Sequence, residues 1–472
     1  MPYSVPKNID PNKIFLVNFS ELEGRLDPIY YASNFLHRFT QSHSVKLKDV
    51  CVSFSSGFGA GKDEQTDEKN GYIQIRPTNI NNNGELVFDK NVFVPLQKTV
   101  GFVEKRTVLF NNTNSQELVG KNAILLEERE LYTSNHITSI VVDETKANAE
   151  YIWIILNVYQ RNKIFFSLCT NWNNQSGIGL DLLQSLKIPV PPLHIQQQIV
   201  NVYNAALSQR KKKLSESKAK LASIDQYLLG ELGITLPEDS YEKTFIVNYK
   251  DVDGGRLDPM YNIDYYNKCE ERFTAKHELF TLKELSKSIF QGCGQDLTEN
   301  ESNKLLKVKN IQVGNVINYL DIENIKMIPN SKRLENGDII SPFIGEAIRQ
   351  IKFSVFNQDG KYVWTVDNNT GVIRINSSKA VSYFIAEVLN SSIGKVQIEK
   401  LISGGGVPFL GANNVKNIKI PLPPLTKQQE IADHISAIRA EAKRLEQEGE
   451  EILQSARLQV EQMILGEKDI EG

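Results

Sequence analysis

Two stretches of the chain, residues 188–236 and 420–468, carry apolar residues at the spacing of long amphipathic helices. In the later stretch these residues recur mostly in alternating steps of four and three, which is the spacing of a coiled-coil seam. They are Ile431, Ile435, Ile438, Ala442, Leu445, Ile452, Ala456, Val460 and Met463. The earlier stretch carries Ile195, Ile199, Val202, Ala206, Leu207, Leu214, Leu221, Ile224 and Leu228. Each helix of about 40 residues is about 60 Å long.

A narrow seam on two helices of one chain favours their pairing with each other as an antiparallel coiled coil. The alternative is that each helix packs separately on the surface of its own domain, which usually requires a wider apolar stripe.

The chain is a tandem duplication, because three motifs recur in the same order. Arg25-Leu26-Asp27-Pro28 returns as Arg256-Leu257-Asp258-Pro259, at an offset of 231 residues. LKIPVPPL (186–193) returns as IKIPLPPL (418–425), and each half closes on Leu-Gly-Glu (229–231 and 465–467). Because proline is excluded from helix interiors, each Pro-Pro pair predicts an extended segment that leads into a helix.

Residues 32–185 and 263–417 differ in sequence, with faint echoes at Leu47-Lys48 and Leu282-Lys283 and at Asn79-Ile80 and Asn310-Ile311. Both regions are predicted to be mixed α/β. Candidate strands in the first are 72–76, 86–88, 108–110, 123–126 and 137–142, followed by a helix over 149–159. Candidate strands in the second are 305–309, 338–340, 351–356, 363–366 and 371–375, followed by a helix over 380–389.

The predicted fold is α+β, a tandem repeat of two mixed α/β domains separated by two long helices that pair as an antiparallel coiled coil. The expected domains are residues 1–187 and 237–419, and the expected spacer helices are residues 188–236 and 420–468. Similar ends and divergent middles indicate two scaffolds of one shape that carry two different surfaces.

Composition narrows the classes of function. The net charge of −3 argues against a protein that coats nucleic acid by bulk attraction, but allows cations confined to two grooves, with a partner supplying further phosphate contacts. The longest apolar run, 151–156, is far shorter than the roughly 20 residues of a membrane helix, and the N-terminus shows no signal peptide, so we expect a cytoplasmic protein. The four cysteines, without a C-x-x-C pair, predict reduced thiols and no metal site.

The segments that come near to known catalytic motifs do not match them. Residues 57–62, Gly-Phe-Gly-Ala-Gly-Lys, have the wrong spacing for a phosphate-binding loop and continue with Asp63, so we expect a flexible or DNA-facing loop. No D/N-P-P-F/Y methyltransferase signature, nucleophile elbow or H-E-x-x-H motif is present. Gly404-Gly405-Gly406 is interpreted as a turn before the second helix, with close backbone approach to DNA as the alternative.

The repeated R-L-D-P-x-Y, I-P-x-P-P-L-x-x-Q-Q and L-G-E motifs together resemble type I restriction-modification specificity subunits over nearly the whole chain. The resemblance implies that the two α/β regions are target recognition domains, each of which binds one half of a bipartite, asymmetric site in double-stranded DNA. It also implies that the helices set the gap between the half-sites and dock adenine methyltransferase subunits, two in number. Restriction (motor) subunits would complete the complex. S-adenosylmethionine would bind the methyltransferase, and this chain would hold no cofactor and catalyse nothing.

Candidate DNA-binding residues are polar or aromatic side chains in or beside predicted turns, the residue types that reach base edges and phosphates. We select Arg76, Asn79, Asn171, Trp172, Asn174, Lys309, Asn310, Gln312, Arg349 and Trp364. For each of them, a solvated loop side chain or a core tryptophan is the competing interpretation. The repeated Arg25, Asp27, Arg256 and Asp258 are interpreted as structural ion pairs at the domain junctions, not as catalytic carboxylates.

Three other functions remain open from the sequence. A fused methylase-nuclease partner, as in type IIB systems, would require the same DNA-recognition chain. A cryptic nuclease or methyltransferase would act on DNA without a partner. A coiled-coil scaffold without a DNA role would show no affinity for DNA even at low salt.

Overall fold

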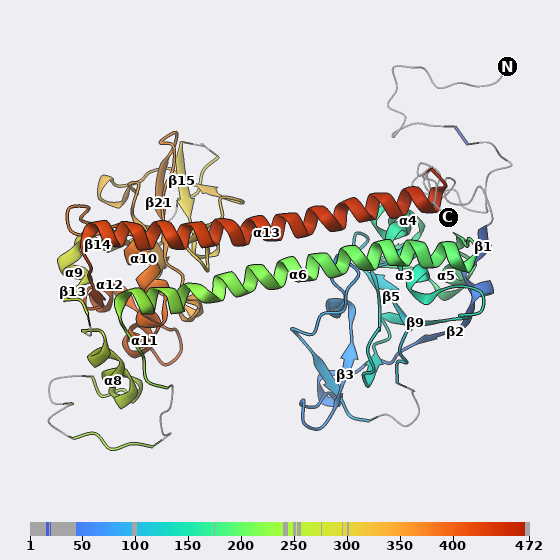
Figure 1. The fold of residues 1–472 in the computed structure, drawn as a ribbon, viewed down its shortest axis with the longest axis horizontal. Coiled ribbons are helices and arrows are strands. Elements are labelled where there is room, and N and C mark those ends of the chain that lie inside the picture. The colour runs from blue at the N-terminus through green and yellow to red at the C-terminus, as the bar shows by residue number, and fades with distance from the viewer. Residues whose placement is uncertain are drawn as a thin grey trace. The chain divides into compact units, whose positions relative to one another are not determined.

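The computed structural model describes residues 16, 17, 19, 44–96, 102–173, 175–238, 244–248, 252, 256–274, 276–294, 296–299 and 302–467. The chain divides into two compact units: unit 1 is Met1–Lys213 with Gln447–Gly472, and unit 2 is Leu214–Glu446 (Figure 1). Each unit therefore combines one α/β region with part of both long helices. The predicted boundaries at 187, 236 and 419 stay predictions. The first Arg-Leu-Asp-Pro motif, with Arg25 and Asp27, lies outside the described residues.

Unit 1 contains two main sheets. The inner sheet has the order β2-β9-β5-β7 and consists of Cys51–Ser56, Ile137–Val142, Val108–Asn111 and Asn122–Ile124. The outer sheet has the order β4-β3-β8 and consists of Val92–Val94, Tyr72–Ile75 and Leu131–Thr133, with β3 and β8 parallel. Helix α3 (Ala149–Arg161) packs on β5 and β7 of the inner sheet. Strand β1 (Ser44–Lys46) pairs with β12 (Lys187–Pro189), which leads into the first long helix.

Unit 2 repeats this order of strands. Its inner sheet is β14-β22-β19-β20, formed by Ser286–Gln291, Thr370–Ile375, Ile339–Pro342 and Ser354–Val355. Its outer sheet is β18-β15-β21, formed by Glu323–Asn324, Asn303–Leu306 and Val363–Val366, again with one parallel pair, β15 and β21. Strand β13 (Leu279–Thr281) pairs with β23 (Lys419–Pro421). The duplication seen in the sequence is therefore a duplication of topology.

The backbone explains the first of the two faint sequence echoes. The N–H of Leu47 donates to the carbonyl of Leu186, and the N–H of Leu282 donates to that of Ile418, both at 2.8 Å. These bonds attach the start of each inner sheet to the segment that precedes each long helix. The second echo, at Asn79 and Asn310, reflects equivalent hydrogen bonds of the two side chains.

Most of the predicted elements are confirmed, and the differences have local causes. Among the expected strands, 137–142 and 363–366 have the predicted bounds. The expected strand 86–88 is reduced to one bridge between Ile80 and Leu86, because the residues before it form a tight loop. The expected strand 351–356 is reduced to Ser354–Val355, since Ile351 has a left-handed backbone with φ of 48°.

Both long helices are confirmed, as α6 (Leu193–Leu232, 40 residues) and α13 (Leu425–Leu465, 41 residues). The predicted stripes need two corrections. Leu221 is 39% exposed, while Tyr203 and Ser217 of α6 are buried. On α13 Leu453 is fully buried, and its neighbour Ile452 is only half-buried.

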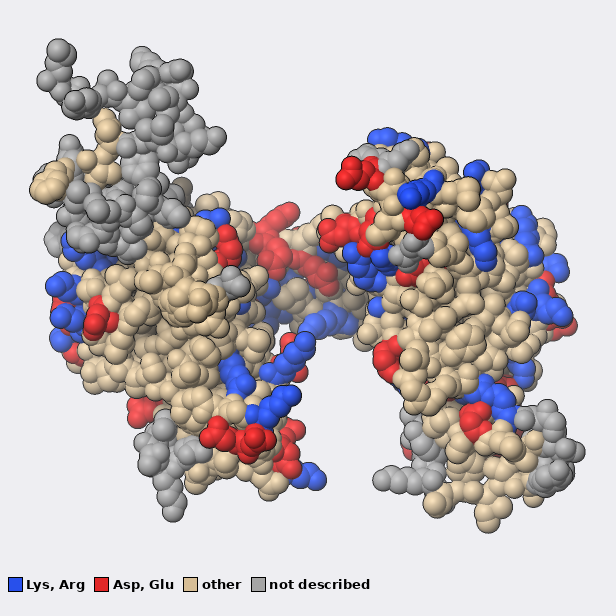
Figure 2. Space-filling model, turned by 180° about the vertical axis from the view of Figure 1, so that it is seen from behind, with Lys and Arg blue, Asp and Glu red and all other residues tan. Residues whose placement is uncertain are grey.

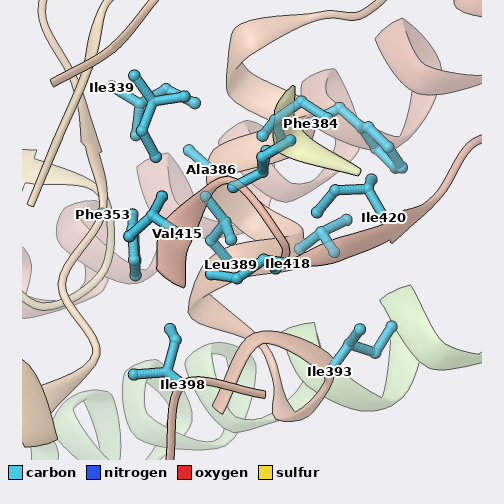
Figure 3. Packing of buried hydrophobic residues seen from close by; sticks show 14 of the residues in the cluster. Ile339, Phe353, Phe384, Ala386, Leu389, Ile393, Ile398, Val415, Ile418 and Ile420 are labelled. Atoms are coloured by element: carbon cyan, nitrogen blue, oxygen red, sulfur yellow. The ribbon is translucent and has the colours of Figure 1, made fainter. Parts of the chain in front are cut away.

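The apolar residues of the long helices join the cores of the two units. Ile199 and Tyr203 of α6 and Leu453 and Val460 of α13 belong to the core of unit 1. In unit 2 the core contains further residues of the two helices, namely Ile224, Leu228 and Leu232 of α6 and Ile431 and Ile435 of α13. Figure 3 shows residues of this core from α10 (Ser382–Asn390), including Phe384 and Leu389, near Ile418 and Ile420. Burial of this kind is the main stabilising contribution to each unit.

One glutamine fixes the start of each long helix. Gln196 is fully buried, donates to the carbonyl of Pro191 at 2.7 Å and accepts from the N–H of Asn148 at 2.8 Å. Gln428 donates to the carbonyl of Pro423 at 2.8 Å and accepts from the N–H of Val381 at 2.9 Å. The Gln of the I-P-x-P-P-L-x-x-Q-Q motif therefore connects the proline segment, the long helix and the N-terminus of α3 or α10.

Candidate nucleic-acid interface

A short hairpin in unit 1 carries two of the predicted DNA-binding residues. Strands β10 (Thr170–Trp172) and β11 (Gln175–Gly177) pair with each other, and β11 also pairs with β6 (Thr113–Asn114) beyond the end of β5. Asn171 and Trp172 are exposed on β10. The third predicted residue here, Asn174, lies outside the described residues. We call residues 170–177 the unit 1 hairpin.

The unit 1 hairpin holds its polar and aromatic side chains in place. The carboxamide oxygen of Asn171 accepts from the hydroxyl of Ser176 at 2.5 Å. The ring of Trp172 lies over Gly177, where an added Cβ would come within 2.4 Å of ring atom Cη2. Trp172 is nevertheless 45% exposed. The hairpin therefore offers a fixed aromatic surface beside amide groups, a combination suited to base stacking and base-edge hydrogen bonds.

Unit 2 has an equivalent segment at the same place in its topology. Phe409 bridges both Ser403 and Ile344, and Ile344 follows β19 as Thr113 follows β5. Between Ser403 and Phe409 the sequence is Gly-Gly-Gly-Val-Pro, with Gly404 at φ of 98° and Val407 exposed. We call residues 403–409 the unit 2 hairpin. The two hairpins occupy equivalent positions and carry different residues, Asn171 and Trp172 on β10 of unit 1 and three glycines, Val407 and Pro408 in unit 2.

Close packing of the backbone accounts for the first glycine of the glycine-rich segment 57–62. A Cβ at Gly57 would lie 1.8 Å from the carbonyl oxygen of Thr133, so only glycine fits where the chain crosses the end of β8. Unit 2 has the same crossing at Gly292, where a Cβ would lie 2.0 Å from the carbonyl oxygen of Val366. The crossing is thus a repeated feature of the scaffold.

Arg76, predicted to contact DNA, anchors this glycine-rich segment. Its guanidinium donates to the carbonyl of Ala60 at 2.9 Å and to the carboxamide oxygen of Gln74 at 3.0 and 3.1 Å. Gln74 in turn donates to the carbonyl of Phe58 at 2.8 Å. Arg76 is half-buried, so its first role in the structure is to hold the loop.

The prediction that Asn79 and Asn310 contact DNA at the surface needs correction, because each residue is only 2% exposed and bonds within its domain. The carboxamide oxygen of Asn79 accepts from the N–H of Arg76, and its nitrogen donates to the carbonyl of Val87, both at 3.0 Å. Asn310 makes the same pair of bonds with Lys307 and Asn318, at 2.9 and 3.0 Å. Both residues close a loop beside the outer sheet, and their side chains form hydrogen bonds within the domain.

The prediction that Trp364 contacts DNA also needs correction, since this residue is 7% exposed and belongs to an aromatic group in the core. The ring centroids of Tyr319 and Phe356 lie 5.5 and 5.9 Å from its own. Its place on the buried strand β21 accounts for this burial. A core tryptophan was the competing interpretation from the sequence.

The remaining predicted residues of unit 2 are exposed. Lys309 and Gln312 flank Asn310, and Gln312 donates to the backbone carbonyl of Lys309 at 2.8 Å. Arg349 pairs with Glu346 at 3.2 Å, with both side chains largely in solvent. A surface pair of this kind contributes little to stability, so Arg349 is available to another anion.

The second Arg-Leu-Asp-Pro motif forms a junction within unit 2. The guanidinium of Arg256 contacts Asp258 at 2.7 Å and donates to the carbonyls of Leu401 and Ile402 at 2.8 and 3.0 Å. Asp258 also accepts from the N–H of Tyr261 at 3.1 Å. These bonds tie the segment to the end of helix α11 (Ser392–Leu401).

Charges of both signs lie on the surface of each unit (Figure 2). On the face drawn in Figure 2, each unit carries both Lys or Arg and Asp or Glu side chains, and residues of neither kind occupy most of the surface. Directly after strand β21, burial raises the pKa of Asp367, whose carboxylate accepts from the Thr370 hydroxyl at 2.7 Å. In the part of the chain that the structure describes, no group of three or more His, Cys, Asp or Glu side chains could hold a metal ion. None of the described helices is both long and apolar enough to cross a membrane.

Comparison with known proteins identifies the family. The family model for the type I restriction modification DNA specificity domain matches residues 41–226 and 276–454. A protein of Methanocaldococcus jannaschii named as a candidate type I restriction enzyme MjaX specificity subunit is 26% identical over 429 residues, which are 83% of this chain and 85% of that protein. The MjaVIII specificity subunit of the same organism is 23% identical over 367 residues, 69% of this chain and 74% of that protein.

A solved structure supports the fold. A chain from a study of complex assembly and conformational transition of the type I R-M system aligns with a TM-score of 0.51 at 14% sequence identity, and the match covers 90% of this chain and 98% of that one. Two matches to one family domain correspond to the two halves of the duplication. The chain belongs to the family of type I restriction-modification DNA specificity proteins.

Proposed function

We propose that this chain is the DNA sequence-specificity subunit of a type I restriction-modification complex, and that each unit recognises one half of a bipartite, asymmetric DNA site. The observation that carries this proposal is the pair of equivalent hairpins with different residues. Asn171 and Trp172 stand in unit 1 where unit 2 has three glycines, Val407 and Pro408. Two scaffolds of the same topology that carry different residues suit two half-sites of different sequence.

The residues proposed to contact DNA are the exposed ones. Asn171 and Trp172 of the unit 1 hairpin and Lys309, Gln312 and Arg349 of unit 2 have the amide, aromatic and cationic groups that bind base edges and phosphates. We add the unit 2 hairpin, where the exposed backbone of Gly404–Gly406 permits close approach to DNA. Arg76 supports the surface by holding the glycine-rich segment. Asn174 remains part of the proposal on its sequence position alone.

We also propose that α6 and α13 pair as an antiparallel coiled coil that sets the gap between the half-sites. In unit 1, Arg210 of α6 bonds to Glu450 of α13 at 2.8 Å, and Lys213 bonds to Glu448 at 2.7 Å. In unit 2 the buried Ser217 donates to Glu446 at 2.9 Å. Within each unit, these bonds between the two helices support the pairing of α6 with α13.

The chemistry is proposed to reside in partner subunits. Two adenine methyltransferase subunits, which bind S-adenosylmethionine, would dock on the long helices, and restriction (motor) subunits would cleave unmodified DNA. This chain would contribute recognition without catalysis and without a cofactor of its own. Such a role would place it in the cytoplasm, with the DNA that it recognises.

Mapping of N6-methyladenine across the host genome tests the proposal, with the gene intact, deleted and altered in one hairpin. Deletion should abolish methylation at one split, asymmetric motif and leave other motifs unchanged. Replacement of residues 171–175 by glycine and serine should degrade recognition of one half of that motif only. Unchanged methylation after deletion, in a strain where the partner subunits are expressed, would refute the proposal.

A further inference from the structure

A short loop in unit 1, residues 81–85, extends from the outer sheet to both long helices. The carboxamide oxygen of Asn81 accepts from the N–H groups of Asn83 and Glu85 at 2.8 and 3.0 Å, which gives the loop its own internal structure. Gly84 has φ of 77°, and its carbonyl accepts from the indole N–H of Trp153 on α3 at 3.0 Å. We call this segment the latch loop of unit 1.

The latch loop contacts each long helix through an arginine. Glu85 bonds to Arg210 of α6 at 3.4 Å, and the same guanidinium bonds to Glu450 of α13 at 3.0 and 2.8 Å. Asn83 accepts from Arg457 of α13 at 2.8 Å. The side chain of Arg210 is only 13% exposed, so one partly buried cation connects the outer sheet, α6 and α13.

Arginine suits this position for a geometric reason. A guanidinium presents five donors in a planar fork and can bind two carboxylates from different directions, whereas a lysine ammonium is a point charge. Removal of Arg210 would leave Glu85 and Glu450, whose side chains are 36% and 54% exposed, without the cation that connects them. Water can solvate both carboxylates, so the expected effect is loss of the connection and not a large loss of stability.

Unit 2 has a corresponding loop, residues 312–316, with different bonds. Gly314 has φ of 86°, and a Cβ there would lie 2.8 Å from Nη1 of Arg439 on α13. Arg439 binds Glu387 of α10 through two nitrogens, and Asn315 donates to the same carboxylate at 3.1 Å. The backbone N–H of Val355 donates to Asn315 at 2.7 Å. In both units, therefore, a loop with a left-handed glycine meets an arginine of α13.

We infer that Arg210 and Arg439 are positioning residues, which fix the angle between the outer sheet of each unit and the long helices and thereby restrict the gap length that the protein accepts between half-sites. This inference rests on the proposed function. The length of a helix defines a gap sharply only if each recognition domain is held rigidly to it. A domain released from its latch would still bind its half-site and would tolerate a gap of the wrong length.

The test measures the affinity of the purified complex for the target found by methylation mapping, with the natural gap and with gaps one base pair longer and shorter. The wild-type complex should prefer the natural gap. Arg210→Ala and the milder Glu85→Gln should lower that preference by about three- to tenfold, the size of coupling effects from single residues away from a ligand. Arg439→Ala should do the same from unit 2.

Controls separate positioning from stability and from failure of the proposed function. Lys443→Ala on α13 removes an exposed cation of the same helix, so the gap preference should not change. Arg210→Lys should restore part of the preference. Variants that bind all gaps more weakly in proportion, with the preference intact, would overturn the inference. A wild-type complex with no preferred sequence would instead overturn the proposed function.

Discussion

Gln196 accepts a hydrogen bond at 2.8 Å from the backbone N–H of Asn148, and this bond joins the first turn of α6 to the N-terminus of α3. Its counterpart in unit 2 is the 2.9 Å bond between Gln428 and Val381. Each glutamine also satisfies a proline carbonyl, so its carboxamide is used on both sides. The repeated Q-Q motif is therefore explained by the first glutamine of each pair.

Gln428→Ala should destabilise unit 2 by about 1–3 kcal/mol, because a buried N–H and a buried carbonyl lose their partner. Gln429→Ala is the matched control, since Gln429 is exposed and donates to Asp433 along the same helix. Urea unfolding of the two variants measures the difference. Equal stabilities of both variants would contradict the role assigned to Gln428.

Asn310→Ala should destabilise unit 2 by about 1–3 kcal/mol, because the N–H of Lys307 and the carbonyls of Asn318 and Leu320 lose a buried partner. Thermal unfolding, monitored by circular dichroism, measures this loss. Asn79→Ala should behave alike in unit 1. A variant as stable as the wild type would mean that water replaces the carboxamide.

Lys309→Ala should leave stability unchanged and weaken DNA binding, since its side chain is exposed beside Asn310. If Lys309 contacts a phosphate, the slope of log affinity against log salt should fall by about 1 and the loss should be similar for all sequences. Binding titrations at several salt concentrations measure both quantities. An unchanged slope would remove Lys309 from the interface.

Sequence patterns predicted the scaffold better than the surface, and the reason is physical. Burial of apolar side chains follows period and spacing, so strands such as 137–142 and both long helices could be located from the sequence. Polar residue types are ambiguous, because an asparagine serves equally to close a loop, as Asn79 does, and to face solvent, as Asn171 does. The pairing of Phe409 with Ile344 joins residues far apart in the chain, and no local pattern indicates it.

Stability of unit 2 should depend on the ionisation of Glu270. Burial alone would raise the pKa of this carboxyl, but hydrogen bonds from Lys400 and Lys419, each at 2.8 Å, outweigh burial and lower the pKa. A carboxyl with a lowered folded-state pKa contributes stability above its unfolded pKa of about 4.3 and loses that contribution as pH falls through the folded pKa.

Glu270→Gln should therefore be less stable than the wild type at pH 7 by about 1–3 kcal/mol, the range for hydrogen bonds to charged groups. The difference should shrink as pH falls below about 4.3. Glu271→Gln is the control, since Glu271 also lies on helix α8 (Asp264–Arg272) and is exposed. Urea unfolding between pH 3 and pH 7 measures the difference, and a gap that stays constant over this range would contradict the assignment.

Trp172 makes DNA binding by unit 1 directly observable. The chain has three tryptophans, and Trp153 and Trp364 are 2% and 7% exposed, against 45% for Trp172. A quencher dissolved in water should therefore reach mainly Trp172. If this ring stacks on a base, target DNA should shield it from acrylamide, and Trp172→Ala should lower affinity by about 1–3 kcal/mol while Trp172→Phe retains part of the stacking.

Gly177→Ala provides a second route to the same conclusion. The added methyl group would displace the Trp172 ring from its place over the hairpin without removing it, so the fluorescence should persist while protection by DNA declines. Protection of Trp172 by target DNA and by unrelated DNA alike would assign the ring to non-specific contact. No protection by either would place the half-site elsewhere on unit 1, and the half-buried amides of Asn112 and Asn114 at β6 would then be the next groups to alter.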